Sequence, residues 1–408
     1  MASIRTAARR ISEKLPNDVV ILSAVRSPVT RAFKGGFKDA YPEDIIGPVM
    51  AEAVKRANIE TKDVNDVLIG NVLAELGFAK TGRMALNHAG FPNSTTFHTV
   101  NRQCSSSLQA ITHTAHSIMV GQIDVALGGG VESMSRNYMA TRGIPQDLSP
   151  RLRNTDVKDA KDCIMPMGIT SENVGERYGI TRQAQDDFAL ESHTRAAKTQ
   201  KKGYFKSQIV PVTITTNNEE TGEEISTVVH SDDGIRGGLT LEKLAKLKPA
   251  FKENGGSTAG NSSQISDGAA ATILARRSWA EERGLKPLGR FIGTQVAGCA
   301  PDEMGISPIY AIPALFKYTG FSLEDVDLIE LNEAFASQAL YCVQKLGLDP
   351  AKVNPNGGAI ALGHPTGATG ARQLATLLAE LERTDKEVGV ISMCASTGLG
   401  VASMFVRE

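Results

Sequence analysis

Long hydrophobic runs, an excess of one charge and paired cysteines are all missing from this sequence, and each absence excludes a class of protein. No apolar run reaches the roughly 18 residues of a membrane-spanning helix, so we expect no membrane span. A net charge of −1 over 408 residues argues against nucleic acid as the main partner. The chain is too long for one compact core and is 41% hydrophobic, which indicates a globular protein of two or three packed units.

The cysteines form no metal-binding or disulfide pattern. No CxxC pair occurs, and no His/Cys cluster has the spacing of zinc ligands, so we expect no metal. An odd number of widely separated cysteines indicates free thiols in a reducing compartment. The five are Cys104, Cys163, Cys299, Cys342 and Cys394.

Apolar strands alternate with amphipathic helices along most of the chain, which is typical of an α/β fold. The first such series runs from "DVVILSAV" at residue 18 to "DVALGGGVESMS" at residue 124, and the second from "DLIELNEAF" to "VGVISMC". Residues 137–247 are more polar, and "TTNNEETGEEISTVVHSDDG" reads as a surface hairpin. The pattern predicts two similar halves and an inserted segment.

Cys104 stands just before a run with helical periodicity. Leu108, Ile111, Ala115 and Ile118 recur at three- and four-residue steps and share one helix face. The serines before them predict a capped helix N-terminus, where the helix dipole makes a thiol more acidic than a free one. Cys104 is therefore a candidate nucleophile, or else a small apolar residue that starts a buried helix.

Two glycine-rich stretches supply further candidates. "GGAIALGHPTGATGAR" holds His364 in a rigid bend, and "SMCASTGLG" places Cys394 at the end of an apolar strand. Glycine at this density serves tight bends or close approach to a ligand. The glycine and proline residues around His364 favour a functional role for this histidine over a structural one.

With these stretches in order along one chain, the sequence resembles the thiolase family, most closely its peroxisomal 3-ketoacyl-CoA members. "NRQCSSS", "NEAFASQA", "GGAIALGHPTGATGAR" and "SMCASTGLG" are similar to the family's four motifs. The resemblance implies two α/β halves, each with a mixed sheet, in a layered α-β-α-β-α core with an inserted loop domain. It implies an N-terminal half at 17–136 continued by 248–287, a loop domain at 137–247 and a C-terminal half at 288–408.

The resemblance also implies a function, an acetyl-CoA C-acyltransferase that cleaves 3-ketoacyl-CoA with CoA during fatty-acid β-oxidation. Cys104 would become acylated, His364 would help remove its proton, and Cys394 would act as general acid and base. Asn332 would hold a water over a thioester oxygen, and the backbone N–H of Ser396 would cover the oxygen of the acyl intermediate. Met167 and Ser263 match positions near the pantetheine arm.

Three of these assignments keep alternatives. Asn332 fits equally as the N-cap of a helix that begins at Glu333, and Met167 as a filler of an irregular core. Cys163, Cys299 and Cys342 lack a glycine frame, so we expect plain core residues there.

The alternative functions are an acetoacetyl-CoA thiolase working in the condensing direction, and a weakened thiolase-like lipid-binding protein.

The resemblance further implies CoA as a co-substrate with no permanently bound cofactor, acyl-CoA as the other substrate, and a homodimer or a tetramer. The peroxisome is the expected compartment, although no clear peroxisomal signal stands before Asp18. The basic first fifteen residues, "MASIRTAARRISEKL", make an amphipathic targeting helix and the mitochondrial matrix the alternative.

Two serines depart from the family pattern. The family usually has glycine where this chain has Ser107 and Ser396. If position 396 requires a positive φ, serine there is strained by about 1–3 kcal/mol. We therefore expect slower turnover or a narrower substrate range.

Overall fold

The computed structural model describes residues 11–138, 143–217 and 221–408. Within them, ten strands form one hydrogen-bonded sheet and β6 and β7 form a separate two-stranded sheet. The strands are β1 (Val19–Arg26), β2 (Thr30–Arg31), β3 (Asp66–Gly70), β4 (Thr96–Val100), β5 (Val125–Ser133), β6 (Val212–Asn217), β7 (Glu224–Val229), β8 (Ser266–Arg276), β9 (Gly289–Gly298), β10 (Leu328–Leu331), β11 (Val388–Ala395) and β12 (Leu399–Arg407).

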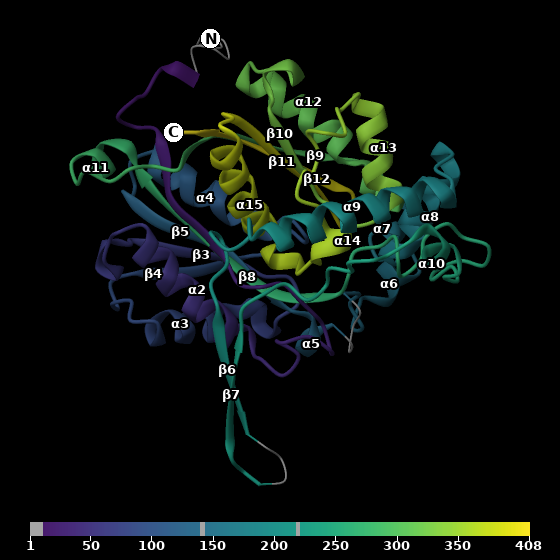
Figure 1. Cartoon of the computed structure of the whole chain (residues 1–408), viewed down its shortest axis with the longest axis horizontal. Coiled ribbons are helices and arrows are strands. Elements are labelled where there is room, and N and C mark those ends of the chain that lie inside the picture. The colour runs from purple at the N-terminus through teal and green to yellow at the C-terminus, as the bar shows by residue number, and fades with distance from the viewer. Residues whose placement is uncertain (1–10, 139–142, 218–220) are drawn as a thin grey trace.

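The helices connect these strands and cover their faces (Figure 1). They are α2 (Pro42–Arg56), α3 (Ala79–His88), α4 (Ser106–Met119), α5 (Met134–Asn137), α6 (Pro150–Arg153), α7 (Lys158–Asp162), α8 (Met167–Tyr178), α9 (Arg182–Lys202), α10 (Leu241–Ala245), α11 (Arg277–Glu281), α12 (Pro308–Thr319), α13 (Ala336–Leu346), α14 (Ala359–Leu362) and α15 (Thr369–Thr384). Short 3₁₀ helices are η1 (Thr61–Asp63), η2 (Glu75–Phe78), η3 (Pro301–Ile306), η4 (Leu323–Asp325) and η5 (Thr366–Ala368).

The large sheet consists of two halves that share an order of four strands, β3-β5-β8-β1 and β10-β11-β12-β9, with β4 added at the edge of the first. In the first half, β4, β3 and β5 are parallel neighbours, and β8 and β1 follow antiparallel. In the second, β10 and β11 are parallel, and β12 and β9 follow antiparallel. In the described part of the chain, the two half sheets are joined by strand pairing at two positions between β1 and β9. The predicted pair of similar halves with mixed sheets is confirmed.

The helices α4 and α15 occupy equivalent places in the two halves and lie against each other between the sheets. Their apolar faces share one core cluster with residues of β1, β5, β8, β11 and β12. The predicted face of α4 is fully buried, as are the leucines of α15 at positions 374 and 381. Both helices are therefore held from two sides, which fixes the segments at their N-termini.

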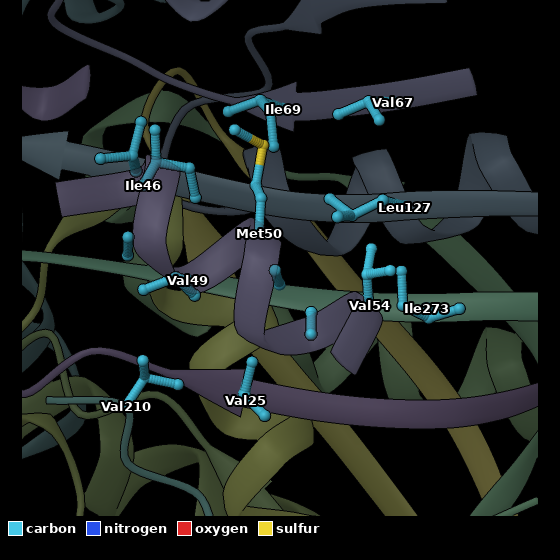
Figure 2. Close-up of a cluster of buried hydrophobic side chains, with 14 of the residues drawn as sticks. Val25, Ile46, Val49, Met50, Val54, Val67, Ile69, Leu127, Val210 and Ile273 are labelled. Carbon is cyan, nitrogen blue, oxygen red and sulfur yellow. The ribbon is translucent and has the colours of Figure 1, made fainter. Parts of the chain in front are cut away.

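Outer helices complete the layers. Figure 2 shows Ile46, Val49 and Met50 of α2 lying over Ile69 and other side chains of the first half sheet. Burying each such side chain stabilises the fold by about 1.5–3 kcal/mol. On the second half sheet, α12 and α13 bury an equivalent cluster at the upper right of Figure 1. The result is the expected α-β-α-β-α layering.

The polar segment inserted in the first half, between β5 and β8, contains α6 to α10 and the β6–β7 hairpin, which projects from the body at the bottom of Figure 1. The hairpin confirms the prediction for its described residues, whereas its turn at 218–220 lies outside them. The boundaries proposed at 137, 247 and 288 stay a prediction. The expected targeting segment falls largely on residues 1–10, which lie outside the described structure. Across the described helices, none combines the length and apolarity of a membrane span.

Candidate active site

The predicted site residues stand at the ends of equivalent elements. Cys104 precedes α4 and His364 precedes α15, the two central helices. Asn332 directly follows β10, and Cys394 lies at the end of its parallel neighbour β11. The carboxyl ends of parallel strands lie at the same edge of a sheet, so Asn332 and Cys394 lie at neighbouring strand ends.

Cys104 lies in a tight turn, two residues before α4. Gln103 before it has a φ of 50°, and the serines after it turn back to this loop. Ser105 Oγ donates to Arg102 O at 2.7 Å, and Ser106 Oγ donates to Gln103 O at 2.5 Å. The expected side-chain cap on α4 is therefore wrong, because these hydroxyls fix the turn that carries the thiol.

The expected acidity of Cys104 is also wrong in sign. Burial raises the pKa of Cys104 to about 11, and the nearby charge of Glu132 adds to this rise. The backbone N–H groups of Ser396 and of Cys104 itself act on the sulfur and lower its pKa, but they do not offset burial. At neutral pH the free thiol is protonated and needs a base.

His364 is buried and held in one orientation. Its bend requires glycine, because Gly363 has a φ of 101° and a Cβ there would lie 2.3 Å from Ser266 Oγ. His364 Nδ1 lies 2.7 Å from Thr369 Oγ1, which donates its own hydrogen to Pro365 O at 3.0 Å. The hydroxyl therefore accepts from Nδ1–H, and Nε2 keeps its lone pair. Burial lowers the pKa of His364 to about 3, so the imidazole is neutral.

Asn332 faces that lone pair. Its Nδ2 lies 3.4 Å from His364 Nε2, and its buried Oδ1 has no partner within the described protein. The N-cap alternative is wrong, because α13 begins at Ala336. An amide oxygen left in this way accepts a hydrogen from a bound water or substrate.

Cys394 is fully buried beside the same site. It packs in a cluster with Met304 and Ala334, against which the partly buried Met167 also lies. Burial raises the pKa of Cys394 well above its usual range, and charge on Cys104 would raise it further. Ser263 N donates to Ala334 O at 2.9 Å, so Ser263 lies beside this cluster. Cys394 therefore stays protonated in the free protein.

The two serine departures act differently from our expectation. Ser396 is not among the residues with a positive φ, which are its neighbours Thr397 at 70° and Gly398 at 84°, so the strain argument at 396 is wrong. Ser107 Oγ accepts from Ala371 N at 3.0 Å and so supplies a cap to α15, whose own N-cap residue makes no side-chain cap.

The other three cysteines differ in how far they are buried. Cys342 is buried as expected, whereas Cys163 and Cys299 keep part of their surface exposed, so the core assignment is wrong for those two. Among the described residues, no group of three or more His, Cys, Asp or Glu side chains is placed to hold a metal ion.

Sequence reasoning missed Thr369 and the buried carboxylates Glu132 and Glu333. Thr369 stands in the quoted glycine-rich stretch, five residues after His364, but a threonine in a turn has many uses. Glu132 is the second-last residue of the apolar strand β5, and Glu333 follows β10 closely. Both places are a signal, since a charge there is buried only when it is well bonded. Both are at least 98% buried.

Comparison with known proteins follows the same division of the chain. Residues 19–278 match the thiolase N-terminal domain and residues 285–407 the thiolase C-terminal domain. The human peroxisomal 3-ketoacyl-CoA thiolase is 51% identical over 389 residues, covering 95% of this chain and 90% of the human protein. That of Yarrowia lipolytica is 48% identical, covering 98% and 95%.

Solved structures agree with the sequence comparison. The dimeric peroxisomal thiolase of Saccharomyces cerevisiae superimposes with a TM-score of 0.88 at 43% identity, covering 98% of this chain and all of that one. The human mitochondrial 3-ketoacyl-CoA thiolase gives 0.86 at 34% identity, covering 97% and 100%. The chain belongs to the thiolase family.

Proposed function

We propose that this protein is a 3-ketoacyl-CoA thiolase, which uses CoA to cleave 3-ketoacyl-CoA into acetyl-CoA and a shortened acyl-CoA. The peroxisomal relatives that share about half of its residues carry this activity in their names. The peroxisome is therefore its compartment and fatty-acid β-oxidation its pathway.

The first half-reaction begins with a proton transfer. The thiol of Cys104, with its raised pKa, gives its proton to His364 Nε2 as the sulfur attacks C3 of the substrate. The bond between C2 and C3 then breaks, and its electron pair stays on C2. Cys394 donates its thiol proton to that carbon, which releases acetyl-CoA and leaves an acyl group on Cys104. Because burial raises its pKa, the Cys394 thiol is protonated before this step and has a proton to give to the carbanion.

The second half-reaction reverses these roles. The Cys394 thiolate takes the proton of incoming CoA, whose sulfur attacks the acyl carbon. Cys104 leaves as a thiolate and recovers its proton from His364. The atoms and charges balance over the cycle, and no permanently bound cofactor is needed.

The negative charge that develops on oxygen in both half-reactions needs hydrogen-bond donors. The backbone N–H groups of Cys104 and Ser396, which act on the sulfur in the free protein, would bind the oxygen of the acyl intermediate. A water held by Asn332, together with His364, covers the thioester oxygen of the acetyl group. Loss of one such donor typically slows an acyl transfer by about a hundred- to a thousandfold.

Substrate binding and assembly are proposed on the same basis. Met167 and Ser263, which lie beside the cluster that contains Cys394, would contact the pantetheine arm of CoA. The yeast relative is dimeric, and we propose a homodimer for this chain as well.

The observation that carries this function is the orientation of His364, whose Nδ1–H is committed to Thr369 while Nε2 is left as a base beside Asn332. The test is a thiolysis assay from acetoacetyl-CoA to long-chain 3-ketoacyl-CoA, with the Cys104→Ala variant as control. We expect CoA-dependent cleavage that the variant lacks. Absence of cleavage by the wild-type protein at every chain length would overturn the proposal.

A further inference from the structure

The buried carboxylate of Glu132 reaches the segment that follows His364. Glu132 belongs to β5 and is fully buried. Its Oε2 accepts from Thr366 Oγ1 at 2.7 Å and from Gly367 N at 2.9 Å, both in η5. Only Pro365 separates His364 from this turn, so the turn sets where the imidazole ring stands.

The same carboxylate holds the loop that supports Cys104. Glu132 accepts from the backbone N–H groups of Val72 and Leu73, each at 3.1 Å, and from Asn71 Nδ2 at 3.3 Å. This loop follows β3, whose last residue packs on the start of α4, because a Cβ on Gly70 would lie 2.4 Å from Ser107 N. One side chain thus joins the supports of the thiol and of the imidazole.

A second buried carboxylate, that of Glu333, binds the segment that precedes His364. Glu333 accepts from Ser192 Oγ at 2.6 Å, from Asn354 Nδ2 at 2.8 Å and from Ile360 N at 3.2 Å. All of these donors belong to the C-terminal half or to α9. Glu333 therefore orders the segment itself, whereas Glu132 ties it to the other half, where Cys104 lies.

We propose that Glu132 is a positioning residue of the thiolase reaction, which sets the approach of the His364 imidazole to the Cys104 thiol by binding both supporting loops at once. The inference rests on the proposed function. Glu132 touches neither substrate nor the reacting atoms and acts through the two loops alone.

Only a carboxylate can serve all of these donors. Every group that Glu132 binds is an N–H or O–H, and an ionised carboxylate has acceptor sites alone. In the Glu132→Gln variant an amide NH₂ replaces one oxygen and faces at least two donors, whichever way the amide turns. The loops then lose their common anchor while side-chain volume is unchanged.

The charge of Glu132 gives the proposal a distinctive readout. After burial, its carboxylate is a further cause of the raised pKa of Cys104. Its removal therefore lowers the pKa of the Cys104 thiol, even as it moves the base away. Loss of a residue with a merely structural role would slow thiolysis and alkylation of Cys104 together.

We expect the Glu132→Gln variant to lower kcat of thiolysis by about 10- to 100-fold, the scale of a displaced general base, with KM for CoA within about threefold. The pH profile of Cys104 alkylation by iodoacetamide should shift to lower pH. An unchanged kcat, or an alkylation profile that does not move or moves to higher pH, would overturn the proposal.

A gentler variant guards against a failure to fold. Thr366→Val removes one donor to Glu132 and should lower kcat by about 3- to 10-fold, whereas Thr366→Ser keeps the hydroxyl and should restore it. The matched control is Thr376→Val in α15, the helix that follows η5, which removes a buried hydroxyl that donates to Gln208 Oε1. Equal kcat for Thr366→Val and Thr376→Val would refute the positioning role. A wild-type protein without thiolysis would refute the proposed function instead.

Discussion

Thr369 determines which nitrogen of His364 carries the hydrogen, and its replacement by valine gives a quantitative test. The hydroxyl accepts from Nδ1–H at 2.7 Å, in a site where the imidazole is neutral. Valine has nearly the same shape but leaves that N–H buried without a partner, which costs about 1–3 kcal/mol. The ring can avoid this cost by moving its hydrogen to Nε2.

In the Thr369→Val variant, a smaller fraction of the protein therefore holds His364 in the tautomer whose Nε2 can act as a base. A tenfold change corresponds to about 1.4 kcal/mol, so we expect kcat/KM of thiolysis to fall by about 5- to 150-fold in the Thr369→Val variant. Thr369→Ser should restore most of the activity because it keeps the hydroxyl. Initial rates with acetoacetyl-CoA measure both, with Thr376→Val as the matched control on α15. A Thr369→Val enzyme within twofold of wild type would refute the tautomer argument.

Three further predictions follow from single contacts. Because burial raises the pKa of Cys104 to about 11, the rate of its alkylation in the free enzyme should rise about tenfold per pH unit from pH 7 to 9, as the thiolate fraction grows; a plateau below pH 8.5 would contradict this. The Ser107→Ala variant loses the cap on α15 and should be less stable by about 0.5–2 kcal/mol in urea unfolding, and no loss would contradict the capping role. Asp232→Ala leaves the fully buried Arg26 without its partner and should cost about 3–5 kcal/mol in the same assay, whereas a loss below 1 kcal/mol would show that the pair is not needed.

The sequence predicted those features that depend on neighbouring residues. The helix face of Leu108 and Ile111 follows from spacing alone, and it is buried between two sheets. The hairpin follows from its turn residues and alternation. Cys104, His364 and Cys394 were recognised because each stands in a local motif, and the structure brings their elements to one place.

Long-range contacts explain what the sequence left out. The acidity of Cys104 was misjudged because its helix end is visible in the sequence but its burial is not. Ser107 caps α15 by accepting from the N–H of Ala371, 264 residues away, so no local pattern predicts the partner. The bonds of Glu132 come from segments about 60 and 235 residues distant, which only the fold brings together.

The central claim is that Cys104 carries the acyl group between the two half-reactions. The most direct measurement is mass spectrometry of the protein after incubation with acetoacetyl-CoA without free CoA, followed by peptide mapping. We predict an added acetyl group on the peptide that holds Cys104, removed on addition of CoA and absent from the Cys104→Ala variant. An adduct on another residue, or turnover without any adduct, would contradict the account.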